Sequence, residues 1–105
     1  MGHDPSRFDI FPAGLPDEVK ARLLKMSKDM GIPQQKIYEE ALKSFEEYRQ
    51  SHKFEYEEYG AGEQTSIRLR IETKKRMLER ARQDDVTAKT LFCNAIRLYY
   101  EKLYG

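Results

Sequence analysis

A repeat constrains this chain more than any other feature of its sequence. Apolar or small residues recur in the two halves at positions 54 residues apart. The pairs are Leu15 and Leu69, Leu23 and Met77, Ile32 and Val86, Ile37 and Leu91, Ala41 and Ala95, and Phe45 and Tyr99. Such a repeat indicates that one structural unit occurs twice. Because a unit of about 40 residues rarely builds a sufficient core alone, we expect the two units to share one core.

Local patterns predict a strand at the start of each unit. Residues 65–71 alternate between apolar and polar side chains, which predicts a strand with Ile67, Leu69 and Ile71 facing the core. Residues 8–15 have strand-forming side chains too, although a proline and a glycine weaken that prediction. Because one short strand is not stable alone, we expect the two strands to pair with each other.

The spacing of apolar residues predicts two helices after each strand. The first begins at Pro16 and ends at Gly31, and a second follows directly. The third covers about residues 72–84 and buries Leu78 with its apolar neighbours. The fourth begins at Thr87, whose hydroxyl is suited to capping the helix, and it buries Tyr99 with its apolar neighbours.

The chain divides into a first unit (8–50), an acidic and aromatic linker (51–63) and a second unit (64–105). The glycines of the linker favour a flexible end, whereas its aromatic residues predict that part of it packs against the protein. Residues 1–53 carry no net charge, residues 54–63 carry −4 and residues 64–105 carry +5. Two interpretations stay open. The charges are solvated helix faces, or the basic second unit is the side that meets a polyanion.

Several classes of protein are disfavoured by the composition. No apolar run is long enough to cross a bilayer, and no secretory h-region is visible. The single cysteine, Cys93, reads as a partly buried structural thiol and fits the cytoplasm. Neither His3 nor His52 lies in a ligand-spaced motif, so we expect no metal and no cofactor. No nucleophile–base pair is evident, so an enzyme is not expected.

The repeated spacing carries a family resemblance. In the first unit it comprises Leu15, Val19, Leu23, Ser27, Gly31, Ile37 and Ala41, and in the second Leu69, Thr73, Met77, Ala81, Asp85, Leu91 and Ala95. Taken together, these positions resemble the ribbon-helix-helix fold of Arc- and MetJ-type repressors. The tandem copy is similar to TraY-like relaxosome proteins and to the border-binding accessory proteins of T-DNA transfer. The resemblance implies a mostly α fold with a two-stranded antiparallel β-ribbon, in which two units form an intramolecular pseudo-dimer.

The resemblance also implies which residues read DNA bases. In this family they lie one, three and five positions before the strand-ending leucine, which here gives Arg68, Ser66 and Gln64. Arginine can donate two hydrogen bonds to guanine, glutamine can pair with adenine, and serine can donate or accept. The alternative is that they are ordinary exposed polar residues of an amphipathic strand.

The first unit departs from this pattern. Its corresponding residues are Gly14, Pro12 and Ile10, none of which can hydrogen-bond a base edge through its side chain. Strand 8–15 is then a structural partner only, or it meets DNA through its backbone and through thymine methyl groups. A bulge that brings Arg7 or Asp9 forward is a third alternative. The departure predicts an asymmetric DNA site.

By the same resemblance, the start of the second helix in each unit clamps a DNA phosphate with backbone N–H groups. These positions are Gln34 and Lys36 in the first unit and Thr87, Ala88 and Lys89 in the second. Such contacts position a protein on DNA without reading sequence.

The predicted partner is therefore double-stranded DNA, bound sequence-specifically with the ribbon in the major groove. The protein would regulate transcription or act as an accessory factor in conjugation or T-DNA transfer. The modest net charge favours several copies bound side by side. Two rival interpretations are a protein-interaction module of the antitoxin type, for which the acidic and aromatic residues 54–59 are the nominated partner surface, and a purely structural helical pseudo-dimer.

Overall fold

The two strands pair with each other in a computed structural model that describes residues 7–105. Strand β1 (Phe8–Leu15) and strand β2 (Glu63–Arg70) form one antiparallel sheet of two strands. Their register places Pro12 opposite Ser66, two residues that are 54 positions apart. The predicted two-stranded antiparallel ribbon is confirmed. The proline is tolerated because in a two-stranded ribbon both strands are edges.

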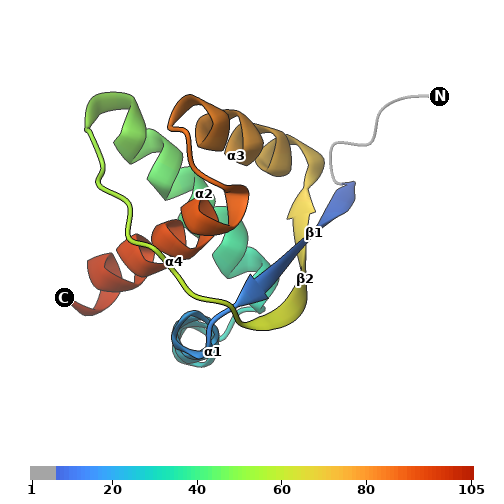
Figure 1. Cartoon of the computed structure of the whole chain (residues 1–105). Helices are drawn as coiled ribbons and strands as arrows, with labels where there is room; N and C mark the ends of the chain where they lie inside the picture. The colour runs from blue at the N-terminus through green and yellow to red at the C-terminus, as the bar shows by residue number, and fades with distance from the viewer. Residues whose placement is uncertain (1–6) are drawn as a thin grey trace.

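Four helices complete a mostly helical fold, as predicted. They are α1 (Asp17–Met30), α2 (Gln34–Ser51), α3 (Ile71–Gln83) and α4 (Ala88–Tyr104). The helices lie to one side of the ribbon, and α2 and α4 pack against each other at the centre (Figure 1). The inward side chains of the ribbon, among them Leu15, Ile67 and Leu69, are buried against these helices. One continuous hydrophobic core results.

Local backbone features also recur at the 54-residue interval. Helices α1 and α3 start at residues 17 and 71, and helices α2 and α4 start at residues 34 and 88. Gly31 and Asp85 both adopt the left-handed conformation after the first helix of their unit, with φ of 66° and 57°. Glycine suits that conformation best, and aspartate is one of the few other residues that tolerate it.

Three expectations about apolar residues were wrong. Ile71 does not extend the strand but begins α3, because Arg70 is an extended N-cap residue and Glu72 suits the first helical turn. Leu78 is 41% exposed, since it lies on the outer side of α3 while Met77 and Ala81 face the core. Tyr99 is only partly buried and packs against the edge of the core rather than inside it.

The linker is packed down along most of its length. Phe54 lies edge-on to Phe45 of α2, with ring centroids 5.0 Å apart, and Tyr56 lies 5.9 Å from the same ring. The linker then crosses α4 before it reaches β2 (Figure 1). The prediction that its aromatic residues pack against the protein is confirmed.

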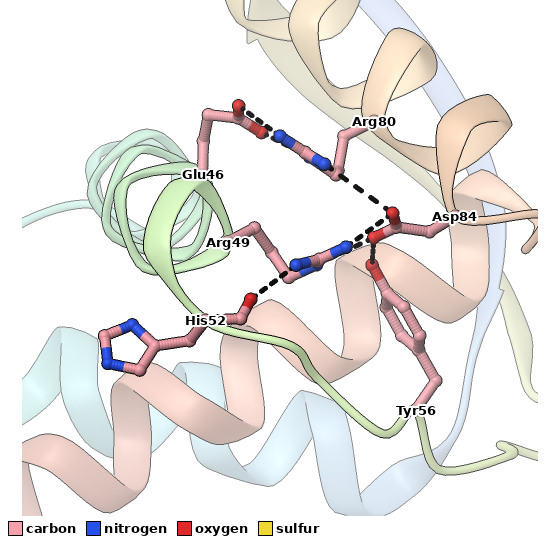
Figure 2. A network of polar contacts seen from close by, with 6 residues as sticks. All are labelled: Glu46, Arg49, His52, Tyr56, Arg80 and Asp84. Atoms are coloured by element: carbon pink, nitrogen blue, oxygen red, sulfur yellow. Dashed lines mark hydrogen bonds and ion pairs between the residues drawn. The ribbon is translucent and has the colours of Figure 1, made fainter.

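A polar network fastens the linker to the ends of α2 and α3. Figure 2 shows the Asp84 carboxylate accepting two hydrogen bonds from the Arg49 guanidinium, at 2.9 and 2.7 Å, and one from the Tyr56 hydroxyl at 2.6 Å. Beside it, the Arg80 guanidinium donates two hydrogen bonds of 2.9 Å to Glu46. The Arg49 guanidinium holds the pKa of Asp84 below its usual range, so the pair stays ionised near neutral pH.

Candidate nucleic-acid interface

The three predicted base-reading residues share the outer face of β2. Gln64, Ser66 and Arg68 are all exposed, whereas the intervening Ile67 and the following Leu69 are fully buried. This placement follows from the alternation of side chains along a strand. Their polar groups therefore point away from the core, along one side of the ribbon.

The register sets three residues of β1 directly opposite them. Gly14 pairs with Gln64, Pro12 with Ser66, and Ile10 with Arg68. All eight residues of β1 pair in an unbroken register, so the alternative of a bulge is excluded. Ile10 is 47% exposed, and it leaves an apolar side chain on the outer face beside Arg68.

The other two candidates, Asp9 in β1 and Arg7 just before it, make contacts to α3. The Asp9 carboxylate accepts a hydrogen bond of 3.0 Å from Lys74 of α3, which lowers the pKa of Asp9. The backbone carbonyl of Arg7 accepts a hydrogen bond from the Ile71 amide at 3.2 Å. Both contacts tie the start of β1 to the start of α3.

Arg68 is steadied by a contact across the ribbon. Its guanidinium carbon lies 5.0 Å from the centroid of the Phe8 ring, which is a cation–π distance. Arg70 is exposed on the same face and pairs with Phe8 in the register. Arg70 was not among the predicted base-reading residues, although its spacing of two from Arg68 was the signal that could have found it.

The N-termini of α4 and α2, where the phosphate contacts are predicted, differ in which of their polar groups already have hydrogen-bond partners within the protein. At α4, the Thr87 hydroxyl accepts a hydrogen bond from the Thr90 amide at 3.1 Å, which confirms the predicted N-cap. Ala88 packs against the core. The Lys89 ammonium donates to the carbonyl of Gly60 at 2.7 Å, so this predicted phosphate contact is also a contact to the linker.

At α2 the helix has no side-chain cap, because Pro33 occupies the N-cap position. The amide of Lys36 donates to the Pro33 carbonyl at 3.0 Å. Lys36 therefore offers a nearby anion its exposed side chain rather than its amide. Gln34 is half-buried beside the end of β1, near Leu15.

Cys93 is fully buried, which is more than the partial burial we predicted. Burial raises the pKa of its thiol to about 11. We therefore expect a thiol reagent such as Ellman's reagent to leave Cys93 unmodified in the folded protein at pH 8 and to modify it in denaturant. Rapid modification of the folded protein, followed by absorbance, would contradict the buried position.

Residues 7–105 contain no group of three or more side chains that could hold a metal ion. None of the described helices is both long and apolar enough to cross a membrane. Comparisons with family models, curated proteins and solved structures found no match for the chain.

Proposed function

We propose that this chain is a single-chain tandem ribbon-helix-helix protein that binds double-stranded DNA sequence-specifically, with its β-ribbon in the major groove. The observation that carries the proposal is the register of the ribbon. It is centred on Pro12 and Ser66, which occupy the same position in the two repeats. Two units related by a two-fold axis would pair their strands in this way, because the one residue of each strand that lies on the axis faces its counterpart in the other repeat.

The shape of the ribbon also supports the proposal. A two-stranded ribbon fits the major groove of DNA, where all four base pairs can be distinguished. Here Gln64, Ser66 and Arg68 lie exposed on the face away from the helices. Thr87, Lys89 and Lys36 stand at helix starts, where backbone amides and cationic side chains favour a phosphate.

The two strands would contribute different contacts to this interface. Strand β2 offers hydrogen-bonding side chains, whereas the exposed side chains of β1 on this face are Ile10 and Pro12, which suit apolar contact with thymine methyl groups. Arg70 extends the basic character of β2 at one end of the ribbon. The proposed interface therefore makes most of its base-specific hydrogen bonds in one half of the DNA site.

Selection of bound sequences from random duplex DNA tests this function. We expect an enriched site with most of its information in one half and with a guanine opposite Arg68. A fully palindromic site would contradict the asymmetry. The absence of any enriched sequence would overturn specific binding.

The mass of the protein in solution tests the single-chain ribbon. Because β1 pairs with β2 of the same chain, we expect a monomer at micromolar concentration by analytical ultracentrifugation. An obligate dimer would instead favour pairing of β1 with β1 between chains and would contradict the tandem interpretation.

The antitoxin-type alternative has weaker support. Its natural contact surface was the acidic and aromatic linker, but Phe54 and Tyr56 pack against Phe45. The proposed function covers both regulation of transcription and an accessory role in DNA transfer, because each requires the same binding of DNA.

A further inference from the structure

Residues 57–63 of the linker lie in the groove between α1 and α4, where they contact side chains of both helices. Asn94, fully buried on α4, grips its backbone: the side-chain amide donates to the Glu57 carbonyl and accepts from the Glu57 amide, both at 2.9 Å. Lys89 donates to the Gly60 carbonyl, and the Arg97 guanidinium lies 3.5 Å from the Glu57 carboxylate. An extended acidic segment is thus held by a basic groove that recognises its backbone.

The same groove exists a second time, between α2 and α3, where no part of residues 7–105 fills it. Its volume is about 600 Å³. Residues that contact the linker have counterparts 54 positions away on its walls: Lys89 corresponds to Gln35, Asn94 to Glu40, Arg97 to Lys43, and Arg22 to Arg76. The repeat therefore presents one filled groove and one open groove of related construction.

The open groove has an apolar floor. Its floor includes the buried side chains of Leu42, Phe45, Met77 and Leu91. Phe45 is also the ring against which Phe54 and Tyr56 of the linker pack. Aromatic side chains are therefore already accommodated around this part of the core.

The rim of the open groove is mainly basic. Its exposed cationic residues are Lys36, Lys43, Arg70 and Arg76. Two of its acids are already engaged by protein groups: Glu39 accepts hydrogen bonds from the Arg70 amide and the Thr73 hydroxyl, and Glu46 pairs with Arg80. Among the groove residues this leaves Glu40 and Glu47 as exposed acids against four exposed bases.

We propose that the groove between α2 and α3 binds an extended, acidic peptide segment of a partner protein, with aromatic side chains that pack toward its apolar floor. The linker supplies the template. Its acidic residues 57–63 lie along α1 and α4, with Tyr59 against Arg22, and Phe54 and Tyr56 just before them pack on the apolar ring of Phe45. Glu40 replaces Asn94 and can accept a backbone N–H but not donate to a carbonyl. The peptide is therefore held by one backbone hydrogen bond fewer than the linker.

A labelled synthetic copy of residues 53–63 serves as the probe against the full chain. We expect saturable binding by fluorescence anisotropy, with amide NMR shifts concentrated at Lys43, Arg76 and their neighbours on α2 and α3. Lys43→Glu or Arg76→Glu should weaken binding at least tenfold. The matched control is Lys75→Glu on α3, an exposed residue outside the groove, which should leave binding unchanged.

Four results would overturn the proposal. The first is no saturation at millimolar peptide, and the second is equal binding of a scrambled peptide. The third is a set of peptide-induced NMR shifts confined to α1 and α4. The fourth is a shift at α2 and α3 without peptide, either on self-association, which would assign the groove to a second copy, or on deletion of residues 1–6, which would assign it to that segment. DNA binding is measured separately, so failure here leaves the proposed DNA-binding function standing.

Discussion

Replacing Arg68 by alanine is expected to reduce discrimination between the selected DNA site and a site altered at the contacted base pair by roughly 10- to 100-fold, since a bidentate arginine–guanine contact is worth about 1–3 kcal/mol. Arg68 is exposed on the outer face of β2, so its loss creates no cavity. Titrations by fluorescence anisotropy with the two duplexes at one salt concentration measure the effect.

The matched control is Arg82→Ala, which removes an exposed arginine from α3, away from the ribbon. It should lower affinity for both duplexes similarly, if at all, because it removes charge without removing a base contact. Arg68→Ala should keep its melting temperature nearly unchanged, since an exposed cation–π contact such as that with Phe8 is worth about 0.5–1 kcal/mol. Unchanged discrimination in Arg68→Ala would refute the base-reading role of β2.

Replacing Asp84 by asparagine is expected to destabilise the fold by about 2–4 kcal/mol. Breaking a buried ion pair costs about 3–5 kcal/mol because it leaves the partner charge uncompensated, and this pair is only partly buried. The side chain of Asp84 is 8% exposed and that of Arg49 is 16% exposed, so water replaces the lost contact poorly. The asparagine amide would also place its own N–H groups against the guanidinium. Urea unfolding followed by circular dichroism measures the loss.

The pH dependence separates this ion pair from simple packing. The pKa of Asp84 is lowered by Arg49 in the folded protein, so the unfolded chain binds its proton more readily. The stability that Asp84 contributes is therefore present above its unfolded pKa of about 3.9 and is lost as the pH falls through the folded value. The difference between wild type and Asp84→Asn should be constant from pH 7 to about pH 5 and shrink below about pH 4.

Asp85→Asn provides the matched control. Asp85 is the next residue, is exposed and has a φ of 57°, a conformation that asparagine also tolerates. Its stability should therefore stay within about 0.5 kcal/mol of wild type. Equal losses for the two variants would show that the network in Figure 2 contributes no specific stability.

Much of the local structure was predictable because it depends on neighbouring residues alone. The alternation of Ile67 and Leu69 with polar residues predicted the inner face of β2, and Gly31 predicted the end of α1. Leu78 shows the limit of such reasoning. Its spacing is compatible with a buried helix face, but α3 turns Met77 and Ala81 toward the core and leaves Leu78 outside.

The candidate DNA interface was predictable only where it depends on local sequence. The outward direction of Arg68 follows from strand alternation, whereas its contact with Phe8 depends on a residue 60 positions away. Lys89 was expected at a helix start, and it is there, but its bond to Gly60 required the path of the linker. Nothing in the spacing of residues indicated that the linker would fill one groove and leave its counterpart open.

The 54-residue repeat by itself determined where helices begin, where the chain turns and which strand side chains face inward, because these properties arise from local backbone preference and apolar periodicity. Only the tertiary structure decided that Pro12 lies opposite Ser66, that Asp84 accepts hydrogen bonds from Arg49 and Tyr56, and that the α2–α3 groove stays open. These outcomes join residues far apart in sequence. They depend on shape, charge and hydrogen bonds that form together only when the core assembles.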